Sequence, residues 1–511
     1  MTTTDKAGSG AAAAGAVLVA TILASGMAFM DGSVVTVALP AIRAGLGAGF
    51  AEGQWTANAY TLTLAAFTLL GGAAGDAFGL RRVFMIGIAL FGLASAACGL
   101  AWSPESLVIA RAIQGVGGAL MVPGSLALIA AHYPPKVRGR AIGTWAAAAS
   151  IAPAIGPVIG GLLVDHGSWR AIFLINLPIA VAALVLCQLR VPADGRGVGA
   201  RMDWVGGALA VLGLGLAAYG LTALADPAGG GAAIDLGLSA LGVLVLVVFV
   251  FWEQRAPNPM MPLALFHSRT FSGVNALTLL LYFALSGALF FLPTALIEAH
   301  HYPAALAGSV FIPFVIVMGV LSRFGGGLAD RIGTRPCLTV GPLLTGLAFL
   351  ALAPAVANGS YGMAVVPAML LMGLGMGITV APLSTAVMNA APAGRSGAAS
   401  GINNAVARVA GLLAVASLGL AVGVGFALAL RGEAGPAAEV VRAVGFGAAP
   451  AGGVADAAIE ALRARATIAG FGAATVICGV LALLAGLVGW LFTGDEAGAA
   501  PAGEASGGSG A

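Results

Sequence analysis

The sequence predicts an all-α polytopic membrane protein, on three observations. Of its 511 residues, 59% are hydrophobic and only 8% are charged, whereas a soluble globular domain carries about 25% charged residues. The mean hydropathy is +1.01, and long apolar runs, not the weak alternation of a membrane β-barrel, fill the chain. The breaks between the runs are charged or contain Pro and Gly. The chain has too little polar surface for a soluble protein and too many apolar residues to be disordered.

Fourteen apolar runs have the length of a membrane span, about 20 residues for a hydrocarbon core about 30 Å thick. They cover 14–38, 54–74, 83–101, 105–130, 140–164, 170–189, 204–224, 235–252, 271–295, 306–328, 337–357, 361–385, 398–430 and 467–492. The first run continues to Asp31, past the length of a signal peptide, and is expected to remain as a span.

The placement of Lys and Arg predicts the orientation. With the N-terminus in the cytoplasm, 14 of these residues fall in inner segments, and the short outer loops hold two, Arg43 and Arg170. Positive charges are retained on the cytoplasmic side. Both termini are therefore expected to face the cytoplasm, as residues 1–13 and a disordered Gly- and Ala-rich tail at 493–511. The outer loop 431–466 is expected to be either a short amphipathic helix or a mobile connector.

An internal repeat divides the chain into halves. A loop pattern recurs with an offset of 254 residues, as Gly72, Asp76, Gly79 and Arg81 and again as Gly326, Asp330, Gly333 and Arg335. Duplicated halves are typical of secondary transporters. We expect six-helix bundles at 14–189 and 271–492, joined by 190–270 with two inserted spans. The sequence contains no GxxxxGK[ST] motif for binding ATP.

Six local motifs, in order along the spans, resemble those of the major facilitator superfamily, specifically its fourteen-span drug:proton antiporters. They are Met30–Pro40, Gly72–Arg82, Arg111–Ala119, Gly156–Gly161, Trp169–Pro178 and Asp203-xx-Gly206-xx-Leu209. The chain departs from the family pattern at Ala77, Leu80 and Ala171. The resemblance implies a major facilitator fold of two six-helix bundles plus two inserted helices, and proton-coupled export by alternating access.

Asp31 is the strongest candidate for the proton-coupling residue. It is an acid deep inside an apolar span, where a charge costs several kcal/mol unless it is paired or protonated. That cost makes its protonation sensitive to its surroundings. Counting residues along the spans places Arg111 in the same outer half of the membrane. Arg408, near the middle of its span, is the other possible partner, and a static structural ion pair is the alternative role.

The repeated loops are candidates for a cytoplasmic gate. Asp76 and Asp330 are expected to contact neighbouring arginines and to close the inner side; the candidate residues are Asp76, Gly79, Arg81, Arg82, Asp330, Gly333 and Arg335. The antiporter motif at Gly156, Pro157, Gly160 and Gly161 permits close helix approach and a bend. In the family it is associated with antiport, although plain small-residue packing would also explain it.

The substrate cavity is predicted from polar and aromatic residues within the spans. The candidates are Asn58, Tyr60, Phe67, Trp145, Asn275, Tyr282, Phe283, Phe311, Asn389, Asn403 and Asn404. The absence of a second deep acid favours neutral, zwitterionic or monocationic amphiphiles. No cofactor and no metal site are expected, because the four cysteines are far apart and His300 and His301 point in different directions on a helix.

The sequence therefore predicts a proton-coupled antiporter of the inner membrane that exports lipophilic drugs or antibiotics, acting as a monomer and without a nucleic-acid partner. A dedicated exporter of one metabolite, such as a self-made antibiotic or siderophore, is an alternative, as is a lipid or glycolipid translocator. A membrane-embedded enzyme is disfavoured because the chain has only five histidines, and a sensor because no soluble domain is apparent.

Overall fold

The computed structural model describes residues 3–192, 203–224, 231–390, 396–446 and 457–493. Within these ranges, some side chains lie outside the description, including those of residues 3–13, Asp76 and Asp330. The described chain is helical and contains no strand. The predicted C-terminal tail thus falls almost entirely outside the described residues.

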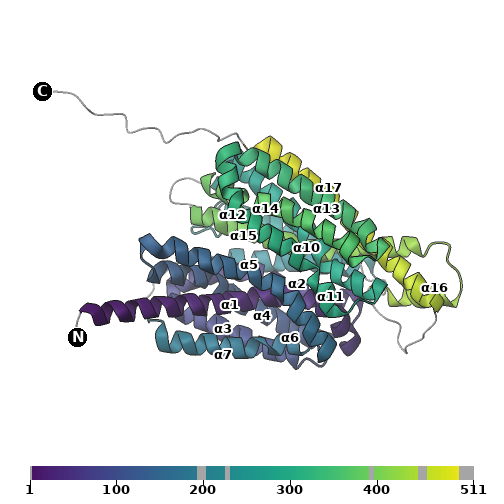
Figure 1. Ribbon diagram of the computed structural model, residues 1–511, viewed down its shortest axis with the longest axis horizontal. Coiled ribbons are helices and arrows are strands. Elements are labelled where there is room, and N and C mark those ends of the chain that lie inside the picture. Colours follow the sequence, from purple (N-terminus) through teal and green to yellow (C-terminus); the bar gives the residue numbers. More distant parts are fainter. Residues whose placement is uncertain (1–2, 193–202, 225–230, 391–395, 447–456, 494–511) are drawn as a thin grey trace.

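The first helical bundle is built from the N-terminal part of the chain (Figure 1). Its helices are α1 (Thr3–Leu46), α2 (Phe50–Phe78), α3 (Leu80–Gly99), α4 (Pro104–His132), α5 (Pro135–His166), α6 (Ala171–Leu174) and α7 (Asn176–Arg190). Helix α1 begins at Thr3, before the predicted residue 14, and the four alanines at 11–14, the best helix former, favour its continuation beyond the apolar run. Ser103 caps α4 by accepting a hydrogen bond from the Ser106 N–H at 3.3 Å.

The second bundle packs against the first and begins and ends with long helices. Its elements are α10 (Arg269–His300), α11 (Ala304–Ser309), α12 (Phe311–Ile332), α13 (Thr334–Asn358), the single turn η2 (Tyr361–Val365), α14 (Val366–Asn389), α15 (Ser396–Ala429), α16 (Pro436–Val444) and α17 (Ala457–Phe492). Of the two alternatives for the outer loop, the structure shows the helix, α16, which packs on α17 and buries Val441.

Between the bundles in sequence lie α8 (Trp204–Leu224), α9 (Ala232–Glu253) and the short helix η1 (Leu263–His267). Helices α8 and α9 pack on each other, and α8 also contacts α2 and α15. Most of α9 is exposed although it is apolar, with Val243, Leu244 and Phe251 on its surface. An exposed apolar helix of this length is stable in contact with lipid and not with water.

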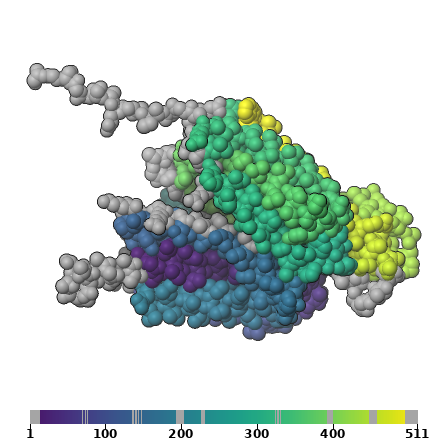
Figure 2. Space-filling view, viewed as in Figure 1, coloured from purple at the N-terminus to yellow at the C-terminus, as the bar shows by residue number. Residues whose placement is uncertain are grey.

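Twelve helices in the described part of the chain are long and apolar enough to cross a membrane. Helices α2 and α5, of 29 and 32 residues, are not among the twelve, and each includes residues outside the description. The chain is thus a multi-pass membrane protein, and the count of fourteen spans stays a prediction. Both the start of α1 and the end of α17 lie at one end of the molecule (Figure 1). Helix α16 lies at the other end (Figures 1 and 2). We call the α16 end the outer end, after the orientation that the sequence predicts.

Candidate coupling site and central cavity

Asp31 of α1 and Arg111 of α4 form an ion pair inside the first bundle. Arg111 Nη1 donates to Asp31 Oδ2, and the two side chains are 0% and 1% exposed. A charge pair withdrawn from water in this way is stable only if further hydrogen bonds satisfy its remaining polar atoms. The structure places Arg111, not Arg408, beside Asp31.

Amide and hydroxyl groups complete the shell around the carboxylate. Gln114 Nε2 and Asn176 Nδ2 each donate to Asp31 Oδ1 at 2.9 Å. Asn176 Nδ2 also donates to Ser95 Oγ at 3.0 Å, and Ser95 donates to the Phe173 carbonyl at 2.8 Å. Gln114, Asn176 and Ser95 are all fully buried. The site therefore draws on α1, α3, α4 and α7, which are helices of one bundle.

Arg111 is held on its other side by α2. Its Nε donates to the Thr56 carbonyl at 2.9 Å, and its Nη1 donates to Gln114 Oε1 at 2.7 Å. The guanidinium carbon also lies 4.4 Å from the centroid of the Tyr60 ring and 5.7 Å from that of Phe173. Such cation–π contacts are strongest where water is excluded. Arg111 therefore joins α1 and α4 to α2.

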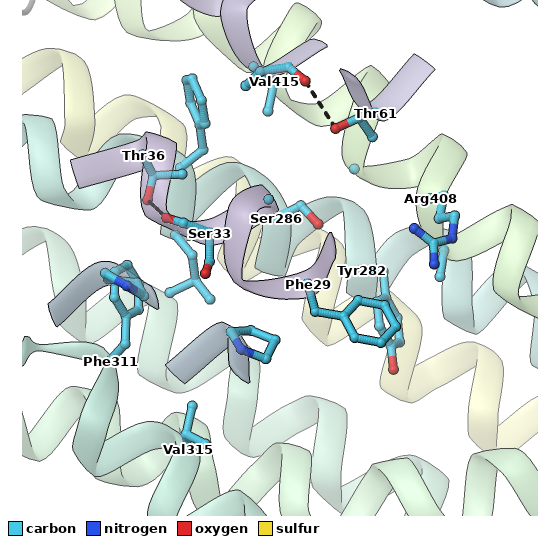
Figure 3. A pocket seen from close by; sticks show the side chains of 18 of the residues that line it. Phe29, Ser33, Thr36, Thr61, Tyr282, Ser286, Phe311, Val315, Arg408 and Val415 are labelled. Carbon is cyan, nitrogen blue, oxygen red and sulfur yellow. Dashed lines mark hydrogen bonds between the residues drawn. The ribbon is translucent and has the colours of Figure 1, made fainter. Parts of the chain in front are cut away.

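A cavity of about 460 Å³ lies between the two bundles. Its walls come from α1, α2 and α5 on one side and α10, α12 and α15 on the other, and they are mostly apolar and aromatic (Figure 3). Phe29, Tyr282, Phe290, Phe311 and Phe314 supply the rings. This size and lining suit a drug-sized amphiphile, since ligand pockets typically measure about 300–1,000 Å³.

The candidate cavity residues divide into two groups. Tyr282, Phe311 and Asn404 line the cavity, as does Arg408. The other candidates do not line it. Asn58 and Tyr60 are buried, Phe67 packs in the first bundle, and Trp145 donates to Ser25 Oγ at 3.1 Å. Asn403 donates to Asn275 and Thr278, and Asn275 lines a second cavity. Phe283 packs against the second bundle's core, and Asn389 ends α14.

Tyr60 separates the ion pair from the cavity. It donates to the Ala28 carbonyl at 2.9 Å and lies against Gly32, which lines the cavity. Tyr60 itself is only 3% exposed. One aromatic ring thus stands between the buried charges and the place where a substrate would bind.

The antiporter motif of α5 packs against two helices of different bundles. A Cβ at Gly156 would meet Ser33 Oγ at 2.3 Å, and one at Gly160 would meet a Val34 methyl at 2.3 Å, both on α1. A Cβ at Gly161 would lie 2.4 Å from the backbone of Ala305 on α11. Pro157 lines the cavity. These small residues permit backbone contact that larger ones would prevent.

Further contacts between the bundles gather at the outer end. Asp165, at the end of α5, accepts hydrogen bonds from the Ala304 and Ala305 N–H groups at 2.9 and 2.8 Å. Arg43 donates to the Phe446 carbonyl at 2.8 Å. Gln54 donates to the Val415 carbonyl at 2.7 Å. The hydrogen bonds between the bundles that the described residues make thus close the outer side of the cavity.

The two repeated loops have matching geometry in the two halves. Gly79 and Gly333 have φ of 98° and 86°, which only glycine adopts without strain. Arg81 donates to the Gln188 carbonyl at 3.0 Å, at the end of α7, and Arg335 donates to the Trp490 carbonyl at 2.8 Å, near the end of α17. Each arginine thus binds the C-terminal end of the last helix of its own bundle, where the helix dipole favours a cation.

Other members of the predicted gate are less informative. Arg82 is exposed. The side chains of Asp76 and Asp330 lie outside the described residues, so the expected aspartate–arginine contacts are not among the described ones.

Two bundles around a central cavity that is closed at one end define a membrane transporter. Residues 21–415 match the model of the Major Facilitator Superfamily. The chain is 34% identical over 482 residues to the tetracenomycin C resistance and export protein of Streptomyces glaucescens, covering 91% of this chain and 89% of that one. It is 35% identical over 414 residues to the multidrug resistance protein Stp of Mycobacterium tuberculosis, covering 79% and 74%.

A solved structure agrees on the fold. The crystal structure of a bacterial homologue of the human lysosomal transporter Spinster, inward-facing and unoccupied, matches with a TM-score of 0.69 at 16% identity, covering 94% of this chain and 98% of that one. The chain belongs to the Major Facilitator Superfamily, and its relatives are antibiotic and multidrug resistance and export transporters.

Proposed function

We propose that the protein is a proton-coupled antiporter that exports lipophilic drugs or antibiotics across the cytoplasmic membrane by alternating access. The observation that supports this most is the Asp31–Arg111 pair, fully buried and one aromatic ring away from a drug-sized cavity. Ionisable groups inside a membrane protein are functional by default. The names of its relatives support antibiotics or drugs as the substrate class.

The proton is carried by the Asp31 carboxylate. In the present state the carboxylate accepts hydrogen bonds from Arg111, Gln114 and Asn176. When the outer side opens, water and a proton reach Asp31, and the neutral carboxylic acid no longer attracts Arg111. Return to the inward-facing state expels the proton inward as the pair forms again. Coupling requires that proton and substrate bind the two states with different affinities.

A short chain of contacts connects the pair to the substrate cavity. Arg111 binds the Thr56 carbonyl on α2, and Gln54, two residues earlier, binds the carbonyl of Val415, which lines the cavity on α15. Release of Arg111 frees this end of α2 to move against α15. The chain of contacts therefore links protonation to separation of the bundles at the outer end.

The topology follows from the same proposal. Helices α2 and α5 complete a set of fourteen spans with the twelve that meet the length and hydropathy criteria. Both termini face the cytoplasm, the chain lies in the inner membrane, and one copy suffices, because the cavity and the ion pair lie within a single chain.

Proton release from energised inside-out vesicles tests the proposal. A pH-sensitive dye reports the pH of the vesicle lumen while unrelated lipophilic compounds are added one at a time. We expect several compounds to release protons from vesicles that contain the wild-type protein or Glu439→Gln, which alters an exposed outer acid. Asp31→Asn should release none, yet should still exchange substrate down its gradient. Undiminished proton release in Asp31→Asn would show that the coupling residue lies elsewhere.

A dedicated exporter of one compound is the second candidate function. The relative that covers 91% of this chain is named for resistance to and export of a single antibiotic, tetracenomycin C. In the same vesicles, a dedicated exporter would respond to one chemical scaffold and to no unrelated compound. A multidrug pump would respond to several.

A further inference from the structure

Arg408 is the only charged side chain among the described residues that line the central cavity. It lies on α15, and its guanidinium points into the space near Tyr282 and Phe29 (Figure 3). Within the described part of the chain it makes no hydrogen bond and no ion pair. The nearby acid, Asp31, already has three donors on the other side of Tyr60.

This arrangement leaves a permanent positive charge inside a mostly apolar cavity that has no other charged residue among the described ones that line it. A guanidinium is always charged in proteins, so Arg408 cannot become neutral as a buried lysine could. Unpaired charges in such surroundings are costly, and an incoming negative group would remove that cost. A cationic substrate would instead be repelled, because charge interactions are strong where little water screens them.

The surrounding side chains restrict the shape of the substrate molecule that carries the negative group. The guanidinium presents two parallel N–H donors that match a carboxylate. The aromatic walls at Phe29, Tyr282 and Phe311 offer flat apolar faces on which a planar ring system can stack. Asn404, one helical turn before Arg408, also lines the cavity and adds a polar group on the same face of α15.

We propose that Arg408 is the anion-binding residue of the cavity, and that the preferred substrates are amphiphilic acids: planar aromatic molecules that carry a carboxylate, phenolate or enolate. The inference rests on the proposed export function and names its substrate class. The absence of a second deep acid predicts neutral, zwitterionic or monocationic amphiphiles, whereas the unpaired Arg408 in the cavity favours acids.

Binding of two matched probes to the purified protein tests the inference without any proton gradient. Anthraquinone-2-carboxylate and anthraquinone-2-carboxamide share one planar body and differ in charge. Their affinities at neutral pH are measured by quenching of the protein's tryptophan fluorescence. We expect the wild-type protein to bind the carboxylate at least tenfold more tightly than the carboxamide.

Substitutions test whether the preference for the carboxylate depends on Arg408. Arg408→Gln should weaken carboxylate binding at least tenfold and leave carboxamide binding unchanged, which also reports that the variant is folded. Arg408→Lys keeps the charge without the paired donors and should retain part of the preference. Arg431→Gln removes the same charge from an exposed outer position and should change neither affinity.

The outcomes separate this inference from the export function. Equal binding of the two probes by the wild-type protein, no binding of the carboxylate, or an unchanged preference in Arg408→Gln would each overturn the assignment, even if proton-coupled export were observed. Conversely, a carboxylate preference that depends on Arg408 stands even if no compound releases protons from vesicles. An Arg408 that served only as a second partner for Asp31 would give no difference between the probes.

Discussion

Gly161→Ala is expected to push the two bundles apart at the outer end. A Cβ at this position would lie 2.4 Å from both the N and the Cα of Ala305, and 2.5 Å from the carbonyl carbon of Ala304. These are backbone atoms of the other bundle and cannot turn aside as a side chain could. Because ordinary carbon contacts lie at about 3.5–4.0 Å, the backbones must separate by about 1 Å.

The size of the effect follows from the cost of overpacking. An extra methyl group in a closely packed site typically costs about 1–3 kcal/mol. The strain exists only while the outer side is closed, since opening separates α5 from α11. The ratio of outward-open to outward-closed molecules should therefore rise by about 5- to 150-fold.

Distances between spin labels measure this population. Trp102, between α3 and α4, and Met363, in η2, are 82% and 86% exposed at the outer end of different bundles, and cysteines there can carry the labels. The four native cysteines are buried. We expect Gly161→Ala to add a longer-distance population that is weak or absent in the unmodified protein.

Gly319→Ala provides the matched control. Gly319 is also a helical glycine, but nothing lies within 4 Å of its Cβ position. This variant should keep the wild-type distance distribution. If Gly161→Ala gave the same distribution as Gly319→Ala, the reasoning that backbone contact at Gly161 holds the outer side closed would be refuted.

Three further predictions concern other contacts. Asp165→Ala removes an acceptor for two backbone N–H groups, at a cost of about 1 kcal/mol, and should favour outer opening about fivefold in the same distance measurement; Glu439→Ala should not. Asn176→Ala removes a donor from the buried carboxylate and should lower the free energy of unfolding by about 1–3 kcal/mol, seen as a reduced melting temperature, and an unchanged melting temperature would contradict it. Arg81→Ala and Arg335→Ala should each speed amide hydrogen exchange at the end of the helix that the arginine binds, and exchange that stayed as slow as in the wild type would show that these contacts do not hold the helix ends.

Much of the architecture could be predicted from the sequence. Apolar runs mark the helices, because each span must be long and apolar to cross a bilayer. Asp31 and Arg111 stand out for a similar reason, since charges are rare at such depth and residue counting places both in the outer half. The repeat at Gly79 and Gly333 likewise predicts two similar bundles, and both loops turn with positive φ.

The shell of the ion pair was harder to predict. Gln114 and Asn176 lie in the motifs Arg111–Ala119 and Trp169–Pro178, but the sequence of these motifs does not indicate that either amide contacts Asp31. A single amide in a span costs far less than a charge, so its presence alone indicates little. The signal that was available is their spacing: Gln114 lies three residues after Arg111 and so shares its helix face.

Only some of the residues predicted to line the cavity do so, because the sequence does not show which face of each helix points toward the cavity. The sequence predicts Tyr60 and Asn58 in the cavity, but both are buried and neither lines it; Tyr60 donates to the Ala28 carbonyl of the first bundle instead. In a soluble helix the polar stripe marks the exposed face. In this chain the helices are apolar on nearly every side, so the sequence does not show which polar residue faces a neighbouring helix and which faces the cavity.

The confinement of the ion pair to one bundle bears on how such a pump can evolve. Asp31 and its partners lie on α1, α3, α4 and α7, whereas four of the five cavity rings and Arg408 belong to α10, α12 and α15. Under the proposed function, substitutions at these four rings change which compounds bind and leave the residues around Asp31 as they are. Substrate choice and proton coupling can then diverge separately among related chains.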